Sequence, residues 1–345
     1  MDLQNLRRND NAKRRKYGYM WALFCAILWG LWYIPGTVIW VLNPFDEMFA
    51  QIAALKGDSV SLVMTAVLIT AFNALTVLLA LTVWIAVLGK LGETKRTIKQ
   101  FRPCSKWFFL ASIFGGPIAI LGSFMAMGLI GGAFAAVAAL LFPIVGAFLA
   151  SIWYGEKISK RAALGILVIL TGGISLYGGS LLTEFQSGSI PYLGLLGGLM
   201  TALGWGIEGA IAGKGLDVAE PDAGLYIRFL SETLLWWIII IPVLAIMGFP
   251  MFTFAAQIFE PLVILVLLFA GITFGFCYVT WYKSFPLVGV GRGQAVGTLA
   301  ALVAVISIYL FFGTAPGIAI VLAAILCISG GVIMITEVTQ TESIR

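Results

Sequence analysis

Residues 261–282 read PLVILVLLFAGITFGFCYVTWY, a run without a charged side chain that is long enough to cross the hydrocarbon core of a bilayer as one helix. Comparable apolar runs recur along the chain and are separated by charged or turn-rich breaks. They lie at 18–42, 60–89, 107–128, 131–153, 162–181, 191–213, 224–248, 261–282, 287–312 and 317–336. The pattern predicts an all-α polytopic membrane protein with ten transmembrane helices.

The overall composition excludes several other classes of protein. The 345 residues are 61% apolar and 11% charged, whereas a soluble domain has about 25% charged residues. There is no His, and the 4 Cys are isolated from one another in the sequence, so zinc, haem and a disulfide framework lack their usual ligands. We therefore expect no metal and no cofactor. The net charge of +5 lies in short loops beside apolar runs, which predicts orientation in a membrane and no nucleic-acid partner.

The distribution of basic residues predicts the topology. Of the 21 Lys and Arg residues, all but Lys56 fall on one side if the N-terminus is cytoplasmic. The positive-inside rule then predicts a multi-pass protein of the cell membrane with both termini in the cytoplasm. The loops expected outside are 43–59, 182–190 and 249–260. The first run lacks an Ala-x-Ala cleavage site, so it should remain in the mature protein.

Several short motifs occur twice in the chain. Trp29-Gly30 returns as Trp205-Gly206, Leu129-Ile130-Gly131 as Leu287-Val288-Gly289, Gly155 as Gly313, and Gly172-Gly173 as Gly330-Gly331. Five spans followed by five more run in opposite directions, so the repetition predicts an inverted repeat, an architecture of secondary transporters that work by alternating access.

The repeat predicts four segments with different roles. They are a basic cytoplasmic tail at 1–17, a first five-helix repeat at 18–181, a second five-helix repeat at 190–336 and a cytoplasmic tail at 337–345. The first repeat is longer because it contains the insertion 43–59. There, Asn43-Pro44 followed by Asp46 and Glu47 predicts the start of a short external helix.

Few ionisable side chains lie inside the apolar runs, and a carboxylate at that depth is a candidate functional group. Glu208 lies in the run 191–213, and Arg228 and Glu232 lie in the next run. Arg228 is one helical turn from Glu232, so we expect these two to form an ion pair or a coupling site. Glu208 is expected to act as the counter-charge of a cationic substrate. The alternative is that Arg228 neutralises Glu208 in a structural ion pair.

Aromatic side chains recur at helical spacing in three runs. They are Trp29, Trp32 and Tyr33 in the first run, Trp205 in the sixth, and Tyr278, Trp281 and Tyr282 in the eighth. Ring faces around a carboxylate are suited to an organic cation, so we expect these residues to bind the substrate. The alternative for the eighth run is that its rings anchor the helix at the membrane interface beside Lys283.

Two sets of motifs resemble known membrane transporters. Phe142-Pro143, Gly155-Glu156-Lys157-Ile158-Ser159 and Gly172-Gly173, together with Trp29-Gly30, resemble the EamA module of the drug/metabolite transporter superfamily. Gly116-Pro117-Ile118, Trp205-Gly206-Ile207-Glu208, Ile227-Arg228 and Phe312-Gly313-Thr314-Ala315-Pro316 resemble bacterial choline permeases that supply phosphocholine decoration of the envelope. The second half departs from the module at Ala301 and Thr314. The resemblance implies a ten-helix carrier that binds choline in an aromatic box near an acid.

The sequence therefore predicts a secondary transporter that takes up small organic cations, choline or a related quaternary amine. Its predicted partners are the lipid bilayer and a coupling proton or the membrane potential. Export of drugs or metabolites by the same module is the alternative. A membrane-embedded enzyme of envelope synthesis is disfavoured because the chain lacks His and paired carboxylates at catalytic spacing. A non-transporting sensory or structural subunit is a further alternative. The oligomeric state is not predicted.

Overall fold

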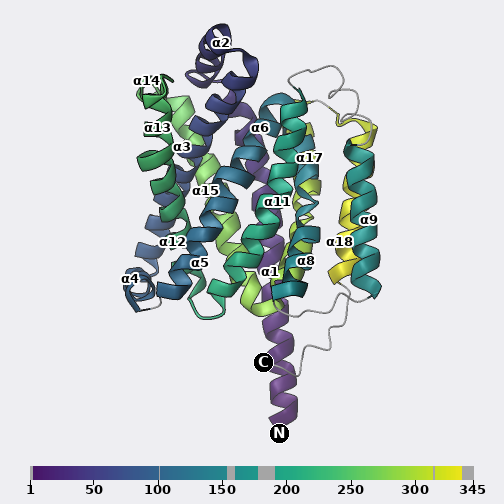
Figure 1. Cartoon of the computed structure of the whole chain (residues 1–345). Helices are drawn as coiled ribbons and strands as arrows, with labels where there is room; N and C mark the ends of the chain where they lie inside the picture. The colour runs from purple at the N-terminus through teal and green to yellow at the C-terminus, as the bar shows by residue number, and fades with distance from the viewer. Residues whose placement is uncertain (1–2, 101, 154–159, 178–190, 314, 336–345) are drawn as a thin grey trace.

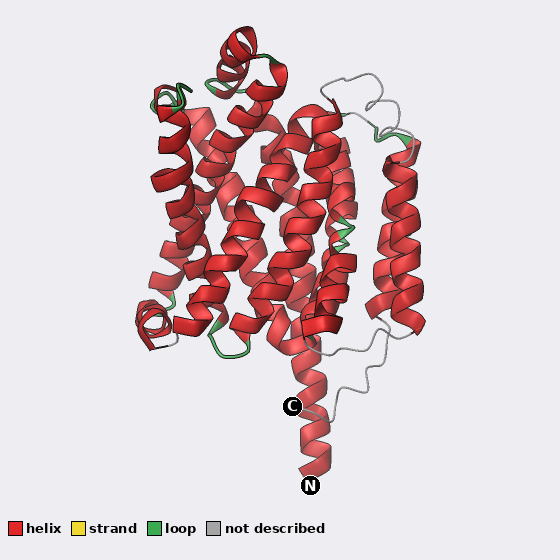
Figure 2. Ribbon diagram, viewed as in Figure 1, coloured by secondary structure: helices red, strands yellow, loops and turns green. Residues whose placement is uncertain are grey.

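A computed structural model describes residues 3–100, 102–153, 160–177, 191–313 and 315–335. In these residues the secondary structure is helical, without strands (Figure 2). The separate apolar helices are α1 (Leu3–Val38), α3 (Asp58–Val87), α7 (Gly132–Ala139), α8 (Phe142–Trp153), α9 (Lys160–Tyr177), α11 (Pro191–Leu216), α15 (Pro261–Val288), α16 (Val290–Gly297), α17 (Ala300–Phe312) and α18 (Ile318–Ile335). Two further apolar helices each contain a π-helical segment. In the first, α5 (Arg102–Ile113) continues through η2 (Phe114–Ile120) into α6 (Leu121–Leu129), and in the second, α12 (Pro221–Leu234) continues through η3 (Leu235–Ile240) into α13 (Ile241–Ile246). The shorter elements are η1 (Ile39–Val41), α2 (Phe45–Lys56), α4 (Leu91–Gln100) and α14 (Met251–Ala255).

The chain is a polytopic α-helical membrane protein. Among the described residues, 8 helical segments are long and apolar enough to cross a membrane, and Ala163–Ser175 and Ile318–Ile333 form shorter apolar helices. The ten-span count stays a prediction, because the apolar segments within α9 and α18 are shorter than the other 8 among the described residues. These two helices pack side by side at the edge of the bundle (Figure 1).

Two apolar spans are broken at equivalent places, as the duplicated motifs predict. Gly131 (φ 97°) and Gly289 (φ 86°) each precede a helix of 8 residues, α7 and α16. The positive φ is a conformation that glycine adopts without strain. A two-residue turn, Leu140-Leu141 or Thr298-Leu299, then leads into α8 or α17. The motif pair therefore marks two matching helix–turn–helix segments.

The contacts of the first glycine pair also match across the chain. Gly30 on α1 faces Val303 on α17, and Gly206 on α11 faces Val145 on α8, each so closely that a Cβ atom would collide with the valine. Val145 and Val303 are equivalent in the register of the duplicated motifs. Each half thus supplies the surface on which the first helix of the other half packs, as a two-fold related repeat requires. The division into two five-helix repeats remains a prediction that these contacts support.

Several predicted boundaries change in the structure. Residues 3–17 belong to a continuous helix, because α1 runs unbroken from Leu3 to Val38, and the start of α1 projects beyond the bundle (Figure 1). Segment 90–106, expected as a loop, contains the amphipathic helix α4, with Thr94 and Thr97 buried and Lys95 exposed. Arg228, counted among the cytoplasmic basic residues, lies buried within α12. Segments 182–190 and 337–345 lie outside the described residues.

The short external helix is confirmed as a helix. α2 begins at Phe45, directly after Pro44, and has Asp46 and Glu47 in its first turn. Acidic side chains are favourable there because they face the positive end of the helix dipole. α2 and α14 lie at one end of the bundle, and α4 and the start of α1 lie at the other (Figure 1). That arrangement is the one that the predicted topology requires.

The topology can be tested with single cysteines in a cysteine-free background. We expect Gln51→Cys on α2 and Gln257→Cys after α14 to react with an impermeant maleimide in intact cells, because both positions are exposed at the predicted outer end. Lys95→Cys on α4 is the matched control and should react only after permeabilisation. If Lys95→Cys alone were labelled in intact cells, the topology would be the opposite of the predicted one.

Candidate functional site

A buried ion triad lies between α11 and α12. The Nε of Arg228 donates to Oε1 of Glu208 at 2.7 Å, and Nη1 of Arg228 donates to Oε2 of Glu232 one turn further along α12. All three side chains are 0% exposed. Arg228 and Glu232 form an ion pair one helical turn apart. Glu208, expected as a free counter-charge, also pairs with Arg228, so its role towards a substrate stays a prediction.

The triad has one carboxylate more than its guanidinium neutralises. Among the described residues, Arg228 is the one basic partner in ion-pair contact with either Glu208 or Glu232. Burying an uncompensated charge inside a membrane costs several kcal/mol. The site is therefore completed electrostatically by one additional positive charge, either a proton or a cation.

Tyr278 on α15 connects the triad to the aromatic residues. Its hydroxyl donates to Oε2 of Glu208 at 2.7 Å, and Nε1 of Trp205 donates to the same hydroxyl at 2.8 Å. On the far side of Arg228, Nε1 of Trp236 donates to Oε1 of Glu232 at 3.4 Å. Glu208 is thus hydrogen-bonded to the aromatic cluster through Tyr278, whereas Glu232 is hydrogen-bonded to Arg228 and Trp236.

Two glycines in the π-helix η2 make room for the triad. A Cβ atom at Gly115 would collide with Arg228 and Glu208, and one at Gly116 would collide with Glu232. The wider π-helical turn and the missing side chains bring the η2 backbone directly against the charged groups. The pair Gly115-Gly116 therefore shapes the site without supplying a polar side chain.

We expect Gly115→Ala to destabilise the protein by about 1–3 kcal/mol, because the added methyl group forces the ion pair apart in a packed interior. Thermal unfolding in detergent measures the change. Gly92→Ala on α4 is the matched control, since nothing lies within 4 Å of its Cβ position. Equal stability of the two variants would show that the triad does not need the space at Gly115.

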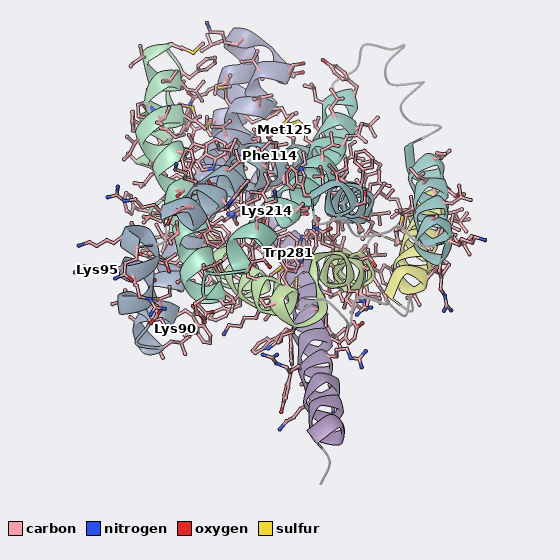
Figure 3. All side chains as sticks on the ribbon, turned by 60° about the horizontal axis from the view of Figure 1, so that its bottom comes forward. Lys90, Lys95, Phe114, Met125, Lys214 and Trp281 are labelled. Carbon is pink, nitrogen blue, oxygen red and sulfur yellow. The ribbon has the colours of Figure 1, made fainter. Side chains whose placement is uncertain are left out.

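The seven predicted aromatic residues all lie in the interior. Each residue is at most 5% exposed. The exposed fraction is 5% for Trp29, 3% for Trp281, 2% for Tyr278, 1% for Tyr33 and Trp205, and 0% for Trp32 and Tyr282. Figure 3 shows Trp281 within the bundle, whereas Lys95 points outward from α4. The rings of the eighth span are therefore packed inside the protein and not at its lipid-facing surface.

The rings form two groups that are joined to each other, because Trp32 contacts Trp205 at a centroid distance of 6.3 Å and Phe274 contacts Tyr278 at 5.0 Å. Trp29 meets Trp205 edge to face at a centroid distance of 4.5 Å, and Trp281 meets Tyr278 at 5.3 Å. Trp32 instead stacks on Phe274 at 4.2 Å and donates through Nε1 to Oδ1 of Asn73 at 3.1 Å. The remaining predicted rings adjoin these groups, Tyr33 beside Trp32 and Tyr282 beside Tyr278.

A small pocket lies among the rings nearest the triad. It is lined by Cys25, Trp29, Trp205, Cys277, Tyr278 and Trp281 and has a free volume of about 10 Å³, roughly the space of one water molecule. Trp29 and Trp205 touch each other, so the space between these two predicted substrate-binding rings is closed in this conformation. Binding of an organic cation between these rings requires them to separate.

Sequence reasoning overlooked four contributors to this site. Gly115 carries no chemistry of its own, and its role follows only from the packing of η2 on the triad. Trp236 follows Glu232 by one helical turn and donates to it. Cys25 and Cys277 are distant in sequence yet line the pocket together.

Comparisons with known proteins find one family match, in the first half of the chain. Residues 48–178 match the EamA-like transporter family. No curated protein matches the chain. Among solved structures, 25 chains match. One of these, a crystal structure described only as that of a protein, covers 92% of this chain and 95% of its own at 17% sequence identity and a TM-score of 0.58. At that identity the likeness concerns the fold alone.

Proposed function

We propose that this chain, which carries an EamA-like transporter domain at 48–178, is a secondary transporter of small organic cations, with quaternary amines such as choline as its substrate class. The observation that carries the proposal is the buried triad with its excess carboxylate, joined through Tyr278 to the aromatic pocket. The proposal concerns the charge of the substrate and applies to uptake and export alike.

The charge balance explains why a cation fits this site. A quaternary ammonium group cannot donate strong N–H hydrogen bonds, so it is recognised through ring faces and net charge. Each ring face contributes roughly 0.5–2 kcal/mol, with the larger values in a desolvated site. Trp29, Trp205 and Trp281 supply such rings in the pocket wall. The net negative triad supplies the counter-charge, and the Tyr278 hydroxyl links its Glu208 to the pocket.

A proton and the substrate are then alternative neutralising charges. In the proposed cycle, the cation enters beside Tyr278 and compensates the triad, and a proton takes its place when the cation leaves. Movement of the two halves about the pocket exposes it alternately to each side of the membrane. The matched contacts of Gly30 and Gly206 support two halves of this kind. The membrane potential would favour entry of a positive charge into the cell.

Removing one ring of the pocket tests its role in binding. We expect Trp205→Ala to weaken choline binding about 5- to 30-fold, because it removes a ring face and the donor to Tyr278. Trp29→Ala should weaken binding to a similar extent. The measurement is displacement of labelled choline from purified protein.

Trp237→Ala is the control, since its Nε1 donates to the backbone oxygen of Ala71 and its ring packs on Phe72. Trp236 is unsuitable as a control because it contacts Glu232. An unchanged choline affinity in Trp205→Ala and Trp29→Ala would remove the aromatic pocket from the proposal.

A further inference from the structure

Two thiols meet in the wall of the pocket. The Sγ atoms of Cys25 on α1 and Cys277 on α15 lie 3.5 Å apart, close enough for one thiol to donate to the other. The two residues are 252 positions apart in the chain and are 1% and 2% exposed. Both line the pocket beside Trp29, Trp205 and Tyr278.

The helices that carry the thiols pack against each other along much of their length. Towards one end, Gly18 on α1 lies directly against Val288 on α15. Towards the other, the ring of Trp32 stacks on that of Phe274 at 4.2 Å. The cysteines lie between these two contacts, so their backbones are held near each other on both sides.

The remaining distance is small for a covalent bond. A disulfide has an S–S length of about 2.05 Å, so the two sulfur atoms would have to approach by roughly 1.5 Å. Rotation of the two short side chains, with a slight adjustment of two helices already in contact, supplies a movement of this size. Cys327, another buried cysteine, does not compete for this pairing, because its thiol donates to the backbone oxygen of Ile169 on α9.

We propose that Cys25 and Cys277 form a redox-active dithiol that is oxidised to a disulfide within the pocket. Dioxygen, which dissolves in the bilayer interior, is the oxidant. Two thiols and one O₂ give one disulfide and one H₂O₂, so that the sulfur atoms lose two electrons and two protons, and O₂ accepts both. A dithiol reductant reverses the bond by thiol–disulfide exchange.

The disulfide would fix α1 to α15 at the pocket wall. This consequence rests on the proposed transport function, because alternating access requires Trp29 on α1 to move relative to the pocket rings on α11 and α15. The oxidised protein would therefore hold the pocket closed, and the reduced protein would be free to cycle. The bond itself is independent of which substrate is carried.

The cross-link is tested on the purified full chain in lipid, with dioxygen and copper–phenanthroline as catalyst. We expect peptide mapping by mass spectrometry to find Cys25 joined to Cys277, with the link lost after dithiothreitol. A variant with Cys104→Ser and Cys327→Ala should form the same link. Protein unfolded in detergent before oxidation should give mixed pairings. The absence of a Cys25–Cys277 link in folded protein, or a link to Cys327 in its place, would overturn the proposal.

The functional consequence has its own measurement. Oxidation should lower the initial rate of choline flux at least tenfold, with recovery on reduction. In Cys25→Ser and in Cys277→Ser, the rate before and after oxidation should be the same for each variant. A mapped Cys25–Cys277 disulfide with unchanged flux would overturn the closing role. If the reduced wild-type protein moves no organic cation, the proposed function fails while the mapped disulfide still stands.

Discussion

Replacing Arg228 with methionine is expected to destabilise the protein by about 3–5 kcal/mol, because it leaves two buried carboxylates without their shared partner. Both Glu208 and Glu232 pair with this one guanidinium, and all three side chains are fully buried. The two carboxylates would then repel each other in a medium that solvates neither. Thermal and denaturant unfolding of the purified protein in detergent measures the loss.

A matched variant separates the loss of charge balance from the loss of packing. Replacing the whole buried cluster by neutral groups of similar size is often close to neutral in stability. We therefore expect that adding Glu208→Gln and Glu232→Gln to the Arg228→Met variant restores most of the stability that Arg228→Met alone loses. If the triple variant is as unstable as Arg228→Met alone, packing of the guanidinium on Phe229 and Tyr278 accounts for the effect.

Glu208→Gln is expected to weaken choline binding at least tenfold, which corresponds to about 1.4 kcal/mol. Exposed ion pairs contribute about 0.2–1 kcal/mol, and a desolvated charge facing the ligand should contribute more. Tyr278 donates to Glu208 and lines the pocket, so this carboxylate is the one nearest the proposed substrate. The measurement is equilibrium binding of labelled choline.

Glu232→Gln is the matched control because Glu232 lies on the far side of Arg228 and contacts Trp236. We expect Glu232→Gln to reduce stability more than choline affinity. Equal losses of affinity in both variants would mean that only the net charge of the triad matters. Wild-type affinity in Glu208→Gln would leave the triad with a purely structural role.

The fold could be predicted largely because the membrane imposes it. A run such as 261–282 has to bury its backbone hydrogen bonds in a helix, and α15 covers that run. The end of α15 was misplaced, since Pro286 lies inside the helix and the chain breaks only at Gly289. Hydropathy alone does not separate residues 283–288 from the next span. The helix α4 was missed because it is amphipathic and too polar to register as an apolar run.

The site was only partly predictable. Burial of Glu208 and Glu232 followed from their lipid-embedded positions, whereas Arg228, counted among the cytoplasmic basic residues, is buried as well. Whether Glu208 on α11 reaches Arg228 depends on how α11 lies beside α12, and the room for the triad comes from glycines on η2 that carry no polar group. Helical spacing predicted the aromatic faces, but spacing within one helix does not give the distance between two rings on different helices. The contact between Trp29 and Trp205 therefore came only with the structure.

Selectivity among three ligands of similar size tests the central claim, that the substrate supplies the missing positive charge. The measurement is flux into proteoliposomes with an imposed membrane potential, using choline, its neutral carbon analogue 3,3-dimethylbutanol as competitor, and glycine betaine. We expect choline to be transported and the neutral analogue not to compete. Betaine should compete much more weakly than choline, because the net negative triad repels its carboxylate in a low-dielectric pocket. Competition by the neutral analogue or by betaine as strong as that of unlabelled choline would contradict the account.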